Sequence, residues 1–226
     1  MRQRNIKNLQ GRIEENSTHL IREPKAMKGR WKEVFGNDRP IYLEVGSGKG
    51  QFILKRAASM RDNNYIACEG QDNVCLRVLE KAEAAGLDNL KVFMEFIHDI
   101  HEYFEDGELE GVYLNFSDPW PKERHAKRRL THRRNLTGFF DVIRDGGTIE
   151  FKTDNDSLFE FSLSEIRELG YEILELTEDL HSEACDYLSK KFPTEYEGRF
   201  MDRGKNINYV KFRKTTEVAD ETGGNK

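Results

Sequence analysis

Short apolar segments alternate along this chain with longer segments whose apolar residues recur at helical spacing. This alternation, with short connections, is typical of an α/β domain built on a mostly parallel sheet. We therefore predict a seven-stranded sheet with helices on both faces. The expected strands are residues 41–45, 65–68, 91–97, 111–116, 148–152, 171–176 and 207–212. The expected helices are residues 51–60, 74–85, 136–143 and 157–169.

Length and composition suit one large domain. The chain has 226 residues, of which 37% are apolar and 34% are charged. Its purely apolar runs span only four to six residues and it starts Met-Arg-Gln-Arg, so we expect no membrane span and no secretory segment. Cys68, Cys75 and Cys185 form no C-x-x-C pair, which argues against a disulfide framework or a cysteine-rich zinc module. These features predict a cytoplasmic protein that does not bind membranes.

Positive charge is concentrated in two segments, although the net charge is -5. Residues 1–32 carry nine Lys or Arg against three Glu, and residues 122–134 carry seven against one. Acidic residues gather elsewhere, chiefly in residues 99–110 and 160–186. A single charged run is usually only a solvated helix face. Two basic runs that flank a candidate site loop instead predict one basic face for a polyanion.

The same patterns predict the domain organisation. Residues 1–30 are expected to form a basic, partly mobile arm, and residues 31–214 the main domain. Residues 215–226 lack the apolar side chains that offset the entropy of ordering, so this tail is expected to be disordered.

Three glycines at alternate positions, Gly46, Gly48 and Gly50, follow the first expected strand and precede a helix. Their spacing matches neither a nucleotide P-loop nor a dinucleotide fingerprint. Glu44 would repel a pyrophosphate but attract a cation, and S-adenosylmethionine carries an ammonium and a sulfonium. Glu69 lies 19 residues after Gly50, where an acid usually binds a ribose diol in this architecture. The loop thus predicts an S-adenosylmethionine site, the alternative being a tight turn without a ligand.

The loop after the fourth expected strand is the most specific stretch of the sequence. It reads Ser-Asp-Pro-Trp-Pro over residues 117–121 and leads into the second basic run. Its two prolines restrict the backbone, so Asp118 is expected to be held at the carboxyl end of a strand. Trp120 offers a stacking face for a base, and the cations that follow suit phosphates. A buried Trp beside an ordinary surface loop is the alternative.

With these residues in view, the chain resembles the bacterial tRNA (guanine-N7)-methyltransferase family, which belongs to the Rossmann-like class I S-adenosylmethionine-dependent methyltransferases. The resemblance covers about residues 30–212 and rests on residues 44–50, 115–130, 151–155 and 194–197. Asn-Phe-Ser-Asp-Pro-Trp-Pro-Lys is highly specific for this family, whereas the glycine loop identifies only the broad class. The resemblance implies transfer of a methyl from S-adenosyl-L-methionine to N7 of a guanine in the tRNA variable loop, at tRNA position 46, by direct in-line displacement.

The resemblance also implies roles for individual residues, with Asp118 as the catalytic residue. The implied cofactor contacts are Glu44, Gly46, Gly48, Glu69, Phe96 and Asp118. The implied tRNA contacts are Lys122, Asp154, Thr194, Glu195, Tyr196 and Glu197. The family often has an acid near position 96, where this chain has Glu95-Phe96. Either Phe96 packs on the adenine or Glu95 takes the polar role.

Several alternatives remain open at this point. Asp154 precedes a helix and can be a simple cap, and residues 194–197 read as a surface loop behind Pro193. His98 and His101 share a helical spacing, but no third ligand is placed, so no metal is expected. N7 of guanine loses no proton when methylated, so Asp118 either stabilises the cationic product or binds the cofactor's ammonium.

Two other functions compete with a tRNA methyltransferase. A small-molecule methyltransferase would explain the glycine loop but not the basic runs, and a non-catalytic RNA-binding protein would not need the three acids. The expected partner is tRNA, without an obligatory protein partner, and the expected state is a monomer or a homodimer.

Overall fold

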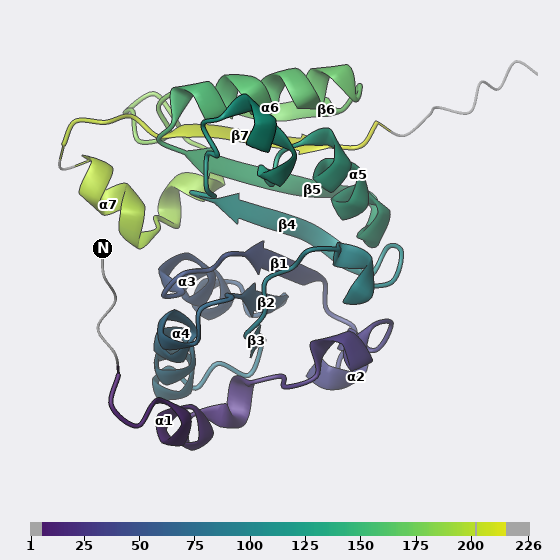
Figure 1. Ribbon diagram of the computed structural model, residues 1–226, viewed down its shortest axis with the longest axis vertical. Helices are drawn as coiled ribbons and strands as arrows, with labels where there is room; N and C mark the ends of the chain where they lie inside the picture. Colours follow the sequence, from purple (N-terminus) through teal and green to yellow (C-terminus); the bar gives the residue numbers. More distant parts are fainter. Residues whose placement is uncertain (1–5, 202, 216–226) are drawn as a thin grey trace, which may run out of the picture.

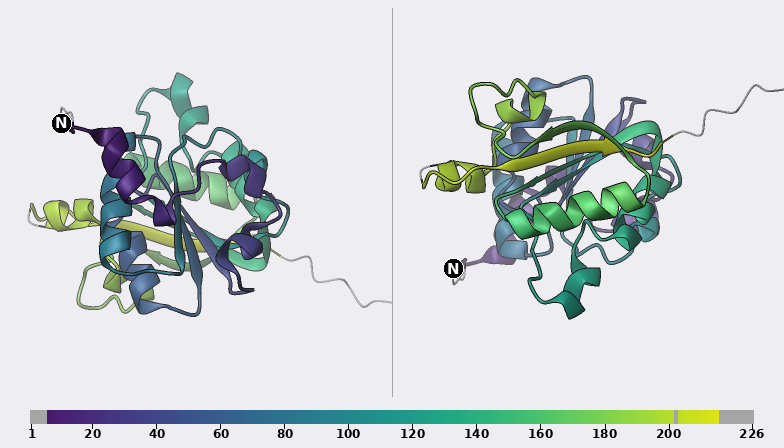
Figure 2. Two further views of the ribbon diagram at one scale, coloured as in Figure 1. Left: turned by 90° about the horizontal axis from the view of Figure 1, so that it is seen from below. Right: turned by 90° about the horizontal axis from the view of Figure 1, so that it is seen from above.

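The computed structural model describes residues 6–201 and 203–215. A seven-stranded sheet in the order β3-β2-β1-β4-β5-β7-β6 runs through its centre, with helices on both faces (Figures 1 and 2). The strands are β1 Ile41–Val45, β2 Asn64–Cys68, β3 Leu90–Phe93, β4 Leu109–Asn115, β5 Ile143–Thr153, β6 Glu172–Thr177 and β7 Asn208–Arg213. The α-helices are α1 Leu9–Glu15, α2 Trp31–Phe35, α3 Gln51–Ser59, α4 Asp72–Ala84, α5 Arg133–Val142, α6 Asp156–Glu168 and α7 Glu195–Met201. Short 3₁₀-helices occupy η1 Ser17–His19, η2 Pro24–Met27, η3 Ile100–Glu102, η4 Glu123–Arg128 and η5 Leu188–Lys191.

Strands β1 to β5 are parallel, and β7 inserts antiparallel between β5 and β6. The predicted mostly parallel sheet with helices on both faces is therefore confirmed. The strand order reverses between β1 and β4, and ligands of such sheets bind at the carboxyl ends of the strands near this point. In Figure 1 the arrowheads of β1 and β4 point to the side of the molecule on which α7 lies.

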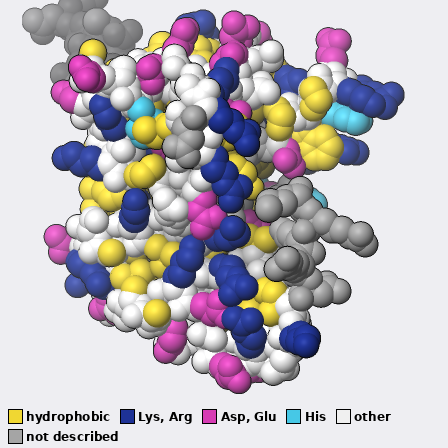
Figure 3. Space-filling view, turned by 90° about the vertical axis from the view of Figure 1, so that its left-hand side faces the viewer, with side chains coloured by type: hydrophobic (Ala, Val, Ile, Leu, Met, Phe, Trp, Pro, Cys, Tyr) yellow, Lys and Arg dark blue, Asp and Glu magenta, His cyan; other side chains and the backbone are white. Residues whose placement is uncertain are grey.

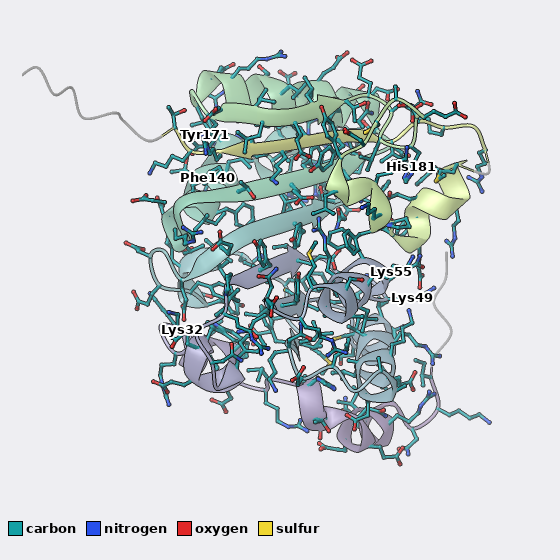
Figure 4. The ribbon with its side chains drawn as sticks, turned by 180° about the vertical axis from the view of Figure 1, so that it is seen from behind. Lys32, Lys49, Lys55, Phe140, Tyr171 and His181 are labelled. Atoms are coloured by element: carbon teal, nitrogen blue, oxygen red, sulfur yellow. The ribbon has the colours of Figure 1, made fainter. Side chains whose placement is uncertain are left out.

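Two apolar cores lie on opposite faces of the sheet, because successive strand residues point to opposite sides. Along β2, Tyr65 belongs to the core that includes α3 and α4, whereas Ile66 belongs to the core that includes α5 and α6. On the second face, Phe140 of α5 meets the ring of Tyr171 edge-on at 4.6 Å (Figure 4). This packing fixes α5, and with it the end of the basic segment that precedes it.

The N-terminal segment packs against the domain. Ile13 of α1 is buried against α4, and the main chain at Leu20 forms a bridge with Val92 of β3. Trp31 is fully buried and donates from Nε1 to the Tyr103 carbonyl at 2.9 Å. At Ile13 and Leu20 the N-terminal segment thus contacts the domain, and the expected division at residue 30 stays a prediction. The predicted tail spans residues 215–226, and all of it except Thr215 lies outside the described residues.

Two segments differ from the prediction. The third strand was expected over residues 91–97 but ends at Phe93, because its partner strand, β2, ends at Cys68, which pairs with Phe93. The residues after Pro193 were expected to form a loop, but α7 begins at Glu195. Its start satisfies a capping box, in which the Thr194 hydroxyl accepts from the Glu197 N–H at 3.2 Å and the Glu197 carboxylate accepts from the Thr194 N–H at 2.8 Å.

Candidate active site

The predicted acids follow successive parallel strands and lie at one edge of the sheet. Glu44 is on β1, Glu69 follows β2, Asp118 follows β4 and Asp154 follows β5. Glu44 and Glu69 line one pocket, and Glu69 and Asp118 line a second pocket beside it. Asp154 lines neither of these pockets. Figure 3 views this edge and shows Lys and Arg side chains in a band across it.

The glycine loop gives the first pocket its floor. Gly46 and Gly48 have φ values of 75° and 57°, in the left-handed region that favours glycine, and a side chain added at either would meet no atom within 4 Å. Their backbone is therefore open to a ligand. Gly50 has a different role, since a Cβ atom there would lie 2.9 Å from Val78 of α4. It allows the helix after the loop to pack closely.

Glu44 is buried beneath this loop. Its Oε1 accepts a hydrogen bond from Asn115 Nδ2 at 2.7 Å, and its Oε2 has no partner among the described residues. Burial raises the pKa of Glu44 to about 8, against the lowering effect of Asn115. A buried carboxylate with one free oxygen is suited to receive a cationic group.

Glu69 closes the same pocket from the end of β2. Its Oε2 accepts from the Gly48 N–H at 2.9 Å and its Oε1 from the Gln71 N–H at 3.1 Å. Burial raises the pKa of Glu69, while these backbone hydrogen bonds act in the opposite direction. The two bonds fix the carboxylate against the glycine loop, and each oxygen keeps a second lone pair for a ligand hydroxyl.

The polar atoms of the pocket fit S-adenosylmethionine. Besides Oε2 of Glu44, the buried hydroxyls of Ser47 and Ser117 and Oδ1 of Asn115 have no partner among the described residues. Such atoms are costly unless a ligand or water satisfies them. An α-amino acid group offers an ammonium to the carboxylate and a carboxylate to the hydroxyls. Sequence reasoning assigned no role to Asn115 or Ser117, although both lie in the family-specific stretch.

The residues after β3 bear on whether Phe96 or Glu95 is available to the adenine. Glu95 also lines the second pocket, but its carboxylate is engaged, because it accepts from the Tyr103 hydroxyl at 2.6 Å. The Phe96 side chain is 60% exposed, lines the second pocket, and lies so close over Gly70 that a Cβ atom there would be 2.4 Å from the ring. This geometry favours Phe96, rather than Glu95, as the residue available to an adenine.

The loop that carries Asp118 has an unusual backbone. Phe116 and Trp120 have φ values of 52° and 41°, in a backbone region that residues other than glycine rarely adopt. Arg129 holds the loop, because its Nε donates to the Pro119 carbonyl at 3.0 Å and its Nη2 to the Trp120 carbonyl at 3.1 Å. Asp118 is exposed between these two strained positions and lines the second pocket. Strain of this kind is often found at functional sites.

The predicted substrate residues on α7 have different environments. Thr194, Glu195 and Tyr196 line the first pocket, and Tyr196 is 53% exposed with its ring stacked on Phe116. Glu197 does not face this pocket: it is fully buried behind it. The expectation that Glu197 contacts the substrate is thus not matched by its position.

Glu195 is held to the opposite wall of the first pocket. Its two oxygens pair with Lys49 at 3.1 Å and with Lys81 at 3.3 Å. Burial opposes ionisation of Glu195, but these lysines outweigh it and keep its pKa below the ordinary value. Lys49 projects from the glycine loop beside α7 (Figure 4). These pairs therefore link α7 to the glycine loop and to α4.

Asp154 and Lys122 lie at the two sides of the site. The cap of α6 is Asn155, whose Oδ1 accepts from the Leu158 N–H at 2.8 Å, so Asp154 is not needed as a cap. Asp154 forms no hydrogen bond or ion pair within the part of the chain that the structure describes. Lys122 is exposed and precedes η4, a segment that projects from the body of the domain (Figure 2).

A wide basic groove adjoins the second pocket. It lies between the loop after β3, η4 and the start of α5, and it shares Phe96, Trp120 and Arg128 with the second pocket. Lys127 and Arg134 also line it, as do Asp99 and Asp141, which pair with His101. The Arg128 guanidinium lies 4.9 Å from the centre of the Trp120 ring. The groove thus combines cations with aromatic faces, as sites for single-stranded nucleic acid do.

Of the two histidines considered for a metal, His101 is engaged by two carboxylates. His101 interacts with Asp99 at 2.7 Å and with Asp141 at 3.2 Å, and these carboxylates raise its pKa. Within residues 6–201 and 203–215, no cluster of three or more His, Cys, Asp or Glu has a geometry that would hold a metal. In the same described residues, no helix has the length and apolar character required to cross a membrane.

Comparison with known proteins places the chain in a family. The family model described as "Putative methyltransferase" matches residues 38–210. The tRNA (guanine-N(7)-)-methyltransferase of Streptococcus equi subsp. zooepidemicus is 45% identical over 92% of this chain and 97% of its own. That of Lactococcus lactis subsp. cremoris is 44% identical over 92% and 95%, and that of Bacillus cytotoxicus 43% over 91% and 94%.

Solved structures agree on the fold. The 16S rRNA methyltransferase KamB is 13% identical and superposes with a TM-score of 0.61 over 83% of this chain and 94% of that chain. An antibiotic-related methyltransferase is 17% identical, with a TM-score of 0.59 over 81% and 92%. These two likenesses show the Rossmann-like class I methyltransferase fold. On the strength of relatives that match nearly the whole length of both proteins, the chain belongs to the tRNA (guanine-N(7)-)-methyltransferase family of S-adenosylmethionine-dependent enzymes.

Proposed function

We propose that this protein transfers the methyl group of S-adenosylmethionine to N7 of a guanine in the variable loop of tRNA. The observation that carries the proposal is the continuity of the site. A pocket built around the free oxygen of Glu44 passes through Glu69 to the Asp118 loop, and this loop leads into the basic groove. A cation-binding pocket next to a polyanion-binding groove is what such a reaction requires.

Each pocket residue has a part in holding the methyl donor. Glu44, fixed by Asn115, binds the ammonium of the methionyl group. Glu69, fixed by the Gly48 N–H, accepts from the ribose hydroxyls, and Phe96 packs against the adenine. The bound cofactor supplies an electrophilic methyl group on a sulfonium. The residues of this chain therefore act by orienting the methyl group rather than by activating it.

The guanine reacts without a general base. The N7 lone pair forms the new carbon–nitrogen bond while the methyl–sulfur bond breaks, and the electrons of that bond remain on the sulfur as a thioether. No proton leaves the base, which becomes cationic. Holding the reacting atoms in line supplies about 7–11 kcal/mol of barrier reduction in well-oriented reactions. Asp118 lies at the rim of the second pocket, where its carboxylate stabilises the positive charge that develops on the base.

The basic groove supports RNA over a small molecule as the methyl acceptor. Lys127, Arg128 and Arg134 line it beside Trp120, so phosphates and an unstacked base find cations and an aromatic face in one place. Tyr196 and Asp154, on the other side of the Asp118 loop, are available to the target nucleotide. Affinity for tRNA should then fall steeply as salt rises, because bound phosphates release counterions.

A transfer assay tests the proposal. The purified protein is incubated with methyl-labelled S-adenosylmethionine and unmodified tRNA transcripts. The label is then identified by nucleoside analysis and by the chain cleavage that reduction and aniline produce at N7-methylguanosine. We expect N7-methylguanosine at one site in the variable loop. Label on another atom would refute the proposed target, and cofactor binding without transfer to any RNA would favour a small-molecule acceptor.

A further inference from the structure

The amine of Lys152 is fully buried at the carboxyl end of β5. Its Nζ donates to the carbonyls of Ser189 and Phe192, both at 3.0 Å, and lies 3.3 Å from Oε1 of Glu197. The three N–H bonds of the ammonium thus meet three acceptors. Two of these acceptors belong to the segment that leads into α7, and the third lies in the first turn of that helix, so one lysine of the sheet holds both.

Glu197 is equally buried, and its carboxylate is fully engaged. Oε1 accepts from the Thr194 N–H at 2.8 Å as well as from Lys152, and Oε2 pairs with His181 Nε2 at 2.8 Å. Burial opposes ionisation, but His181 and Lys152 outweigh it and keep the pKa of Glu197 below its ordinary value. The carboxylate is therefore directed toward the protein interior and is not free to accept from a guanine.

These contacts connect the two walls of the site. Lys152 lies on β5, two residues before Asp154, which follows that strand. The Lys152 Nζ lies 5.1 Å from the centre of the Phe52 ring, and Phe52 lines the first pocket. Glu197 also accepts from the Thr194 N–H. Both Thr194 and Tyr196 line the first pocket. His181 approaches Glu197 from the loop after β6, beside α7 (Figure 4).

We infer that Lys152 and His181 are positioning residues, which hold Glu197 and thereby set the start of α7 as the wall of the cofactor pocket. The inference rests on the proposed function, and it gives Glu197 an inward, organising role instead of contact with the base. Neither Lys152 nor His181 lines either cofactor pocket. Their effect on catalysis is therefore exerted through α7.

Charge pairing makes the inference testable with near-isosteric variants. Lys152→Met leaves the buried Glu197 carboxylate without its cation, which is strongly unfavourable. Glu197→Gln leaves the buried ammonium unpaired. The double variant Lys152→Met/Glu197→Gln removes both charges and keeps a side-chain oxygen that can accept from the Thr194 N–H. If the charges act only as a pair, the double variant should function better than Lys152→Met alone.

The readouts separate positioning from substrate contact. We measure the Kd of S-adenosylhomocysteine by calorimetry, and kcat and KM for tRNA. Lys152→Met should weaken cofactor affinity and lower kcat by at least about tenfold each, with partial recovery in the double variant. If Glu197 contacted the guanine instead, Glu197→Gln and the double variant would lose tRNA turnover equally, and cofactor affinity would be unchanged. That result would overturn the inference.

His181 gives an independent test if Lys152→Met does not fold. His181→Gln retains a donor for Oε2 of Glu197 and should keep cofactor affinity within about threefold, whereas His181→Ala should lose about tenfold, the usual range for one hydrogen bond to a charged group. Equal affinities for the two variants would contradict the inference. Lys205→Met is the matched control, because Lys205 forms an exposed pair with Asp156. Calorimetry does not need RNA, so failure of the proposed tRNA activity would be recognised separately.

Discussion

Asn115 Nδ2 donates a hydrogen bond of 2.7 Å to Oε1 of Glu44, and Oε2 of the same carboxylate has no partner among the described residues. Asn115 ends β4 and Glu44 lies on β1, so two neighbouring parallel strands build this contact at the switch point of the sheet. The contact orients a buried acid and leaves one of its oxygens for a cation.

Glu44→Gln should weaken the binding of S-adenosylhomocysteine, because the amide cannot neutralise the ammonium. We expect a loss of about 10- to 100-fold, in line with the roughly 1.5–3 kcal/mol of a hydrogen bond to a charged group. Calorimetry at constant pH measures it. Glu172→Gln, which alters only an exposed ion pair with Arg213 of β7, serves as the control. An unchanged Kd would exclude Glu44 from the site.

The raised pKa of Glu44 predicts an opposite pH dependence for stability and for binding. The raised pKa of about 8 keeps Glu44 protonated in the folded, ligand-free protein over a range in which an ordinary glutamate, with a pKa of 4.5, is ionised. This contribution to stability is full below about pH 4.5 and is lost as the pH rises through about 8. Affinity for a cationic ligand should rise over the same range. Melting temperature and Kd between pH 5.5 and 7.5 test both trends, and Glu44→Gln should flatten them.

Asp118→Asn should lower kcat more than Glu69→Gln does at saturating cofactor. Asp118 is expected to stabilise the charge that develops on the base, an effect confined to the transition state, whereas Glu69 is expected to contribute mainly to cofactor affinity. We expect a loss of about 100-fold for Asp118→Asn, by analogy with the removal of other electrostatic stabilisers. Single-turnover rates measure it. Turnover of Asp118→Asn equal to that of the unmodified enzyme would rule out this role.

The cations of the basic segment should have two different roles. Lys127 and Arg128 are exposed and line the groove, so Lys127→Ala/Arg128→Ala should raise the Kd for tRNA and reduce its salt dependence while cofactor affinity stays constant. Arg129 holds the Pro119 and Trp120 carbonyls, so Arg129→Ala should chiefly lower kcat. Filter binding at several salt concentrations and single-turnover rates distinguish the two effects. The basic-face account fails if the double variant binds tRNA normally.

Ile13→Ala should destabilise the protein, because α1 is part of the folded domain. Ile13 is buried against α4, and truncation of a buried isoleucine to alanine costs about 2–5 kcal/mol. Urea unfolding measures this free energy. A variant as stable as the unmodified protein would instead indicate that the segment does not pack on the domain in solution.

The sequence predicted the sheet well because β1 to β5 are parallel and buried on both faces, and such strands read as short apolar runs. The sequence does not show which strands pair, so the third strand was expected to continue past Phe93. Its partner β2 has ended at that point. The capping box that starts α7 is a local signal, Thr194 followed three residues later by Glu197. This signal could have predicted the start of a helix, but Pro193 led to the prediction of a loop.

The sequence could place Glu44, Glu69, Asp118 and Asp154 at one edge of the sheet, because their positions follow from strand ends. Asn115 was missed because its role depends on the register of β4 against β1, a contact between residues 71 positions apart. The inward direction of Glu197 depends on Lys152 and His181, from two other segments. Residues that act through long-range contacts of this kind carry no local signal.

The most direct test of the central claim compares two tRNA transcripts that differ in one atom. One has guanine at the proposed target in the variable loop, and the other has 7-deazaguanine, which lacks the N7 lone pair. Both are incubated with the protein and methyl-labelled S-adenosylmethionine, and binding of each RNA is measured in parallel. The account predicts that both transcripts bind and that only the guanine transcript is labelled. Equal labelling of the two transcripts would contradict it.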